Sequence, residues 1–195
     1  ECVVDGKNRG YVSFDNECFK LTLDNTDGFV KGALIAKKDF IFSKIMLKDF
    51  LRFENDDLFF ANGYQAWTTS REFSKFDKLN GLIAPAKINP QLKHFAGLSG
   101  DYHFESYGEV GHFHSYTYCY FRKKDSRNIT LYGSKSERKG FTIFDVDMTG
   151  GVFCIKKDVE GLSLKAGEEY VLFDIAVISG DFDEVMDKYF FDFVG

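Results

Sequence analysis

The sequence is poor in proline and cysteine and has no long hydrophobic run. Only Pro85 and Pro90 occur among 195 residues, so no proline-rich linker divides the chain and its length suits one domain. None of the four cysteines forms a C-x-x-C pair, and the chain is too poor in cysteine for a disulfide scaffold. We therefore expect reduced cysteines and a cytoplasmic location. No apolar run approaches the roughly 20 residues that cross a bilayer, so no membrane contact is expected.

Clustered positive charge and nucleotide-binding motifs are also missing. The formal net charge is −5, and lysine and arginine are scattered singly or in pairs. Without a basic stripe for a phosphate backbone, nucleic acid is not an expected partner. The sequence has neither a G-x-S-x-G nucleophile motif nor a glycine-rich phosphate loop, and we expect no cofactor.

Aromatic residues are abundant, with 23 Phe and 10 Tyr, and these residues favour strands. In Glu17–Asp24, Phe19, Leu21 and Leu23 alternate with more polar residues, as in a strand with one buried face. Further strands are expected over Phe40–Phe53, His114–Lys123, Ile129–Tyr132, Phe141–Val146, Val152–Lys156 and Tyr170–Ile178. Glycine-containing turn pairs, among them Asn62-Gly63, Gly150-Gly151 and Glu160-Gly161, separate many of these runs. The pattern predicts an all-β fold, a large antiparallel β-sandwich.

Two of these strands carry more specific expectations. His114–Lys123 is expected to be one strand with Tyr116, Tyr118 and Tyr120 on the same face. Tyr170–Ile178 is apolar on both faces apart from Asp174, which is typical of a central strand covered on both sides.

Two regions depart from the strand pattern. Asn80–Gly100 contains both prolines and reads as a long surface loop. Asp181–Phe193 is predicted to be a helix with Asp181 as its N-cap. Its apolar residues share one stripe, namely Phe182, Val185, Met186, Tyr189, Phe190 and Phe193. That stripe could pack on the sheet of this domain or on a following domain.

Two groups of residues with metal-binding or acid–base chemistry are present. His112 and His114 form an H-x-H pair, which resembles the metal motif of cupins but lacks the glutamate that follows it there. We interpret them as ordinary strand histidines. Asp145 and Asp147 would share a strand face, but the sequence does not set the separation that a two-carboxylate mechanism needs, so solvated strand-edge charges are the favoured interpretation.

The segment Phe59–Phe73, FFANGYQAWTTSREF, contains the only tryptophan among groups suited to hydrogen bonding. Sugars are bound by an aromatic ring against their C–H face and by polar groups at their hydroxyls. Trp67 and Tyr64 supply rings here. Polar groups come from Asn62, Gln65, Thr68, Thr69, Ser70, Arg71 and Glu72. On composition alone, a structural Trp67 that closes the end of the sandwich is the favoured alternative.

NGYQAWTTSREF also resembles the NG-[aromatic]-Q-[Ser/Ala/Thr]-W motif in the N-terminal β-domain of glycoside hydrolase family 36, the bacterial α-galactosidases or melibiases. In that family a β-supersandwich precedes a catalytic (β/α)8 barrel. The resemblance implies a supersandwich over residues 1–180 and a linking helix over 181–195. The family's two catalytic aspartates lie in the barrel, so the chain alone is expected to be inactive and to hold no catalytic residue and no metal.

The resemblance also implies partners and a site. The expected partners are the barrel of the same polypeptide, galactosides bound by the parent enzyme, and further copies in a homo-oligomer. Trp67 would be the sugar platform, Gln65 and Arg71 polar contacts, and Tyr64 and Asn62 further binding residues.

Two other classes of function stay open from the sequence. One is a free-standing carbohydrate-binding module that depends on Trp67. The other is a cupin-like metal-binding β-protein with His112 and His114 as ligands.

Overall fold

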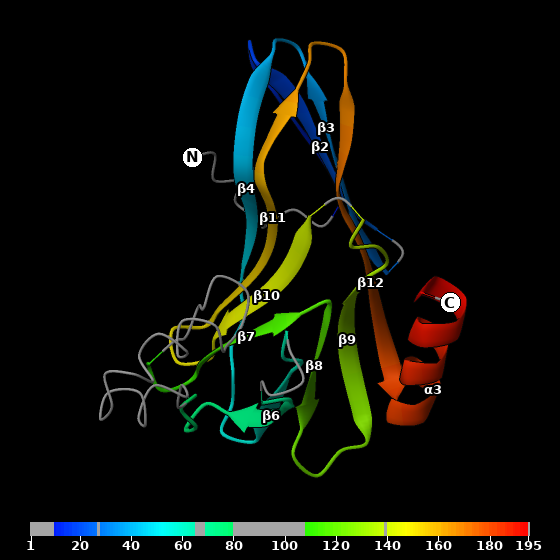
Figure 1. The fold of residues 1–195 in the computed structure, drawn as a ribbon. Helices are drawn as coiled ribbons and strands as arrows, with labels where there is room; N and C mark the ends of the chain where they lie inside the picture. The colour runs from blue at the N-terminus through cyan, green and yellow to red at the C-terminus, as the bar shows by residue number, and fades with distance from the viewer. Residues whose placement is uncertain (1–9, 27, 65–68, 80–107, 139, 195) are drawn as a thin grey trace, which may run out of the picture.

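In its described residues the chain forms a sandwich of two antiparallel β-sheets, with a helical segment near the C-terminal end (Figure 1). The computed structural model describes residues 10–26, 28–64, 69–79, 108–138 and 140–194. The prediction of an all-β antiparallel sandwich is confirmed.

The larger sheet has eight strands and the smaller one has four. The larger sheet has the order β1 (Tyr11–Asp15), β2 (Phe19–Thr26), β3 (Phe29–Ala36), β12 (Glu169–Asp181), β9 (Asn128–Ser134), β8 (Tyr118–Lys123), β5 (Asp57–Ala61) and β6 (Arg71–Ser74). The smaller sheet has the order β4 (Phe40–Phe50), β11 (Val152–Leu164), β10 (Phe141–Asp147) and β7 (His112–Tyr116).

The main core lies between the two sheets and is rich in phenylalanine. Phe59 and Phe73 from the larger sheet and Phe113 from the smaller one are almost completely buried. The Phe73 and Phe113 rings stack with centroids 4.4 Å apart. Offset ring pairs add to the gain from burial, so the aromatic content of the sequence is used mainly to join the sheets.

β12 occupies the centre of the larger sheet, between β3 and β9, as its apolar sequence predicted. Ile175 is buried in the main core, whereas Ala176 is buried on the opposite face in a second apolar cluster. Cover on both faces is therefore confirmed in this part of the strand. Val171, nearer its start, is half exposed.

The C-terminal segment covers the face of the larger sheet that points away from the main core. The α-helix α3 (Phe182–Asp187) continues as a π-helix, η2 (Lys188–Val194), and the Asp181 carboxylate accepts a hydrogen bond from the Asp183 N–H. The predicted helix and its N-cap are thus confirmed. Val185 and Tyr189 are buried against β9 and β12, which lie beside the helix in Figure 1. The apolar stripe therefore packs on the sheet of this domain.

Close approach of this helical segment depends on a glycine in β9. A Cβ atom at Gly133 would lie 2.2 Å from the nearest atom of the Tyr189 ring. The missing side chain lets the ring lie directly on the strand backbone, where the Tyr189 hydroxyl donates to the Ser134 carbonyl at 2.7 Å.

The prediction of one strand over His114–Lys123 is wrong. The chain leaves the smaller sheet after Tyr116 and enters the larger sheet at Tyr118, and Thr117 between them has a φ of 69°. A left-handed residue turns the backbone sharply, so β7 and β8 belong to different sheets. Tyr118 and Tyr120 do share a face, but Tyr116 lies on the other sheet.

The turn predicted at Glu160-Gly161 is also wrong. β11 continues through it, and its register against β4 shifts between Asp158 and Leu162. Glu160 and Gly161 have φ values of 53° and 84°, so the pair forms a bulge inside a long strand. The Glu-Gly pair did indicate residues with positive φ, but positive φ values occur in β-bulges as well as in hairpin turns.

Of the cysteines in the described ranges, Cys119 and Cys154 are buried and Cys18 is exposed, and all three are free. No helix within the described ranges is long and apolar enough to cross a membrane. The predicted loop Asn80–Gly100 lies outside the described residues.

Candidate functional site

Asn62 connects the end of β5 to the residues around Thr117, where the chain crosses from the smaller sheet to the larger one. Its main-chain N–H donates to the Ser115 hydroxyl at 2.7 Å, and its side-chain amide donates to the Tyr116 carbonyl at 3.0 Å. The Tyr116 N–H returns a hydrogen bond to the Asn62 carbonyl at 2.9 Å. The Ser115 hydroxyl then donates to the Tyr118 carbonyl at 2.5 Å. Asn62 therefore has a structural role at the point where the chain changes sheets.

Replacement of Asn62 by Ala is expected to lower the free energy of unfolding by about 1–2 kcal/mol, because the Tyr116 carbonyl loses a partly buried partner. Urea unfolding followed by circular dichroism measures the change. Asn128→Ala, at an exposed position, is the control and is expected to stay within about 0.5 kcal/mol of the parent protein. Equal effects of the two substitutions would contradict the structural role of Asn62.

The sequence-predicted residue Tyr64 belongs to an aromatic group at the same end of the sandwich. Its ring centroid lies 5.2 Å from that of Tyr116 and 5.9 Å from that of Phe141. Its side chain is nevertheless 40% exposed. An aromatic ring held by two others and open to solvent on part of its surface is a suitable platform for a ligand.

Arg71 begins β6, opposite Ala61 at the end of β5. Its guanidinium carbon lies 4.2 Å from the centroid of the Phe73 ring, and its Nη2 is 3.6 Å from Asp77 Oδ1. Burial alone would raise the pKa of Asp77, but the Ser74 N–H, the Ser74 hydroxyl and Arg71 together lower it. The arginine is thus positioned by a ring and a carboxylate, while half of its side chain stays exposed.

The two ends of the β5–β6 connection are linked, since the Gly63 N–H donates to the Ser70 hydroxyl at 2.9 Å. Asn62, Tyr64 and Arg71 are therefore grouped at one end of the β5–β6 pair. Gln65 and Trp67, the other two predicted binding residues, lie outside the described residues.

Glu72, one of the polar residues of the predicted sugar-binding segment, belongs to a polar group on the opposite face of β6. Its carboxylate accepts from Arg122 Nε and Nη2, each at 2.5 Å, and from the Tyr120 hydroxyl at 2.9 Å. The hydrogen bonds from Arg122 hold the pKa of Glu72 below its ordinary value, whereas burial followed by the bond to Glu72 raises that of Tyr120. About 50 residues separate the partners in sequence, so no local pattern could have found them.

His112 and His114 lie on β7, opposite Asp147 and Asp145 of β10. His112 Nε2 is 3.3 Å from Asp145 Oδ1, and Lys156 Nζ is 2.9 Å from Asp145 Oδ2. The hydrogen bond with Asp145 is the main cause that raises the pKa of His112. No group of three or more potential metal ligands occurs among the described residues.

The interpretation as a solvated charge is wrong for Asp145. Asp145 is buried, with 8% of its surface exposed. Asp147 accepts hydrogen bonds from the Thr149 and Gly150 N–H groups at 3.0 and 2.7 Å, which shapes the turn between β10 and β11. Asp147 remains partly exposed, whereas the partners of Asp145 lie on the neighbouring strands β7 and β11, which the sequence of β10 does not indicate.

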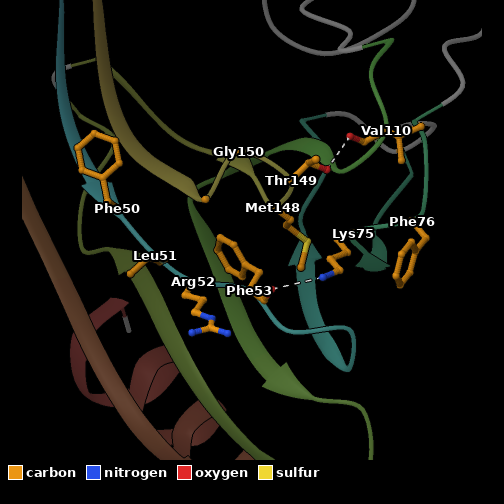
Figure 2. Close-up of a pocket in the computed structure, with 11 residues that line it drawn as sticks. Phe50, Leu51, Arg52, Phe53, Lys75, Phe76, Val110, Met148, Thr149 and Gly150 are labelled. Atoms are coloured by element: carbon orange, nitrogen blue, oxygen red, sulfur yellow. Dashed lines mark hydrogen bonds between the residues drawn. The ribbon is translucent and has the colours of Figure 1, made fainter.

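A pocket of about 580 Å³ lies beyond the other end of β6. Figure 2 shows Phe50 and Phe76 on opposite sides of it, with Met148 and Lys75 between them. Its lining comprises Phe50, Leu51, Arg52, Phe53, Lys75, Phe76, Val110, Met148, Thr149, Gly150 and Gly151. Of the sequence-predicted binding residues, Asn62, Tyr64 and Arg71 lie in the described part of the chain, and none of these three lines the pocket.

Comparison of the chain with models of known protein families gave no match, and a comparison with curated proteins found no similar one.

Proposed function

We propose that this chain is the N-terminal, non-catalytic domain of an α-galactosidase-like retaining glycoside hydrolase. It packs on a catalytic (β/α)8 barrel of the same polypeptide and contributes a loop near the sugar site. The observation that carries the proposal is an antiparallel sandwich in which the NGYQAW segment begins at an anchored residue, Asn62, and is followed by a half-exposed ring, Tyr64.

The division of chemical roles follows from the retaining reaction. In the parent enzyme one carboxylate attacks the anomeric carbon and another protonates the leaving oxygen. Neither is supplied by this domain. Its own contribution is binding: Trp67 and Tyr64 present rings to the C–H face of a sugar, while Gln65 and Arg71 donate hydrogen bonds to hydroxyls.

The anchoring of the loop's ends supports this role. Asn62 is tied to the crossover, Gly63 is bonded to Ser70, and Arg71 is placed over Phe73. Binding groups on a connection whose ends are fixed lose less conformational freedom when a ligand binds, so they contribute more to affinity.

The first test is an activity assay with an aryl α-galactoside. The chain alone is expected to release the aryl group no faster than buffer, because it lacks the two catalytic carboxylates. In the parent enzyme, Trp67→Ala is expected to lower kcat/KM about tenfold or more, since truncation of a central aromatic binding residue typically costs about 2 kcal/mol or more. Tyr11→Ala removes an exposed ring from the edge strand β1 and is the control. Turnover by the chain alone would overturn the proposal.

A free-standing carbohydrate-binding module is the second candidate, and the exposed part of the Tyr64 ring favours it. Such a module binds sugar without a barrel. Calorimetric titration of the chain alone with galactose-containing oligosaccharides separates the two. Saturable binding that is lost in both Trp67→Ala and Tyr64→Ala selects the module, whereas no binding selects the domain of a larger enzyme.

A further inference from the structure

We propose that the pocket bounded by Phe50 and Phe76 binds a small organic carboxylate with an apolar or aromatic body. Asn62, Tyr64 and Arg71 do not line this pocket, and the inference does not depend on the proposed function. Its volume of about 580 Å³ falls within the range of pockets that hold small molecules.

The charge of the lining points to an anion. Among the described residues that form it, Arg52 and Lys75 are cationic and none is acidic, although the chain as a whole carries a net charge of −5. Arg52 is engaged, since its Nε lies 3.0 Å from Glu54 Oε1. Lys75 is partly buried, and in the described part of the chain it has no carboxylate partner. Its Nζ donates to the Phe53 carbonyl at 3.4 Å and lies 5.6 Å from the centroid of the Phe76 ring.

Lys75 therefore keeps donor capacity for a further acceptor. An ammonium group has three N–H donors, and the carbonyl of Phe53 takes one of them at a long distance. A bound carboxylate would accept a charge-assisted hydrogen bond, which is roughly twice as strong as a neutral one.

The remaining lining residues indicate which kind of group, apart from the carboxylate, the ligand carries. Phe50 and Phe76 are 70% and 65% exposed, and Met148 lies buried below them. Neutral sugars need side-chain acceptors as well as donors at their hydroxyls, and the described lining offers only the Thr149 hydroxyl, which donates to the Val110 carbonyl at 3.3 Å. An apolar or aromatic body beside the carboxylate matches these surfaces better than a neutral sugar does.

The backbone at the floor of the pocket is held by hydrogen bonds and close contacts. The turn between β10 and β11 is fixed by Asp147, and a Cβ at Gly151, whose φ is 71°, would lie 2.7 Å from the Leu51 carbonyl oxygen. The Leu51 N–H donates to the Gly151 carbonyl at 3.0 Å. The fold itself therefore positions the floor of the pocket, which lowers the entropic cost of binding.

The test is a titration of the protein with 3-phenylpropionate, followed by heteronuclear NMR shifts and by calorimetry. Saturable binding is expected, with the largest shifts at Lys75, Phe76 and Gly150. The neutral analogue 3-phenylpropanamide is expected to bind about tenfold more weakly, because it lacks the charge that Lys75 contacts.

Matched variants locate the effect. Lys75→Met keeps the aliphatic part of the side chain and is expected to weaken 3-phenylpropionate binding about tenfold, while Lys75→Arg retains it within a few-fold. Lys124→Met makes the same change of charge at an exposed lysine outside the pocket and is expected to leave binding unchanged. Equal affinity for acid and amide, equal effects of the two methionine variants, tighter binding of galactose than of 3-phenylpropionate, or no saturable binding would each overturn the inference. Circular dichroism of each variant verifies that it is folded.

Discussion

Replacement of Tyr189 by Ala is expected to lower the free energy of unfolding by about 3–5 kcal/mol. Tyr189 is completely buried and fills the space above Gly133, between the C-terminal helical segment and the outer face of the larger sheet. Its removal leaves a cavity, since the glycine offers no side chain to fill it, and it takes the hydroxyl donor from the Ser134 carbonyl. Urea unfolding followed by circular dichroism measures the loss.

Two matched variants separate the contributions. Tyr189→Phe keeps the ring and removes only the hydrogen bond, so a loss of about 1 kcal/mol is expected. Phe191→Ala removes an aromatic ring of the same segment that is 77% exposed, and its effect is expected to stay within about 0.5 kcal/mol. If Tyr189→Ala were no more destabilising than Phe191→Ala, the helical segment would not be packed as described.

Replacement of Glu72 by Gln is expected to cost about 2–3 kcal/mol in stability at neutral pH. Arg122 and Glu72 are only 22% and 26% exposed, so the arginine would be left without its anionic partner in a partly desolvated position. The bond from the Tyr120 hydroxyl would also change from charge-assisted to neutral.

The same substitution is expected to alter the dependence of stability on pH. Because the folded pKa of Glu72 is depressed, its contribution is fully present above the ordinary glutamate pKa of about 4.3 and is lost as the pH falls through the folded pKa. The difference in unfolding free energy between the parent protein and Glu72→Gln is therefore expected to be constant from about pH 6 to 8 and to shrink on acidification below about pH 4.

Glu169→Gln, at an exposed position that begins β12, is the control for the charge change and is expected to leave stability within about 0.5 kcal/mol. A difference between the parent protein and Glu72→Gln that stays the same at pH 3 and pH 7 would rule out the ion pair as its source.

Much of the fold was predictable because burial imposes a local period. Alternation at Phe19, Leu21 and Leu23 identified β2, and the helical stripe with its Asp181 cap identified the C-terminal helix. These patterns report which residues share a face, and for the helix also where it begins. They do not report which element lies against that face.

The candidate site was predictable only in part. The aromatic and polar residues at Asn62–Arg71 stood out by composition, and the structure places Tyr64 and Arg71 at one end of the β5–β6 pair. The structural role of Asn62 was not visible in the sequence, because its hydrogen-bond partners, Ser115 and Tyr116, lie more than 50 residues later. The pocket beside Lys75 likewise joins several separate segments of the chain.

By itself, the sequence determined that strands with one apolar face would pair into an aromatic-cored sandwich, and that an amphipathic helix would follow them. Only the tertiary structure decided that the chain changes sheets at Thr117, that Glu160 and Gly161 form a bulge rather than a turn, and that Glu72 pairs with Arg122. The physical reason is that hydrophobic periodicity is set by neighbours in sequence. The sheet to which a strand belongs, the point where the chain changes sheets, and the ion pairs all depend on groups that are far apart in sequence. The contacts between such groups leave no pattern among sequence neighbours.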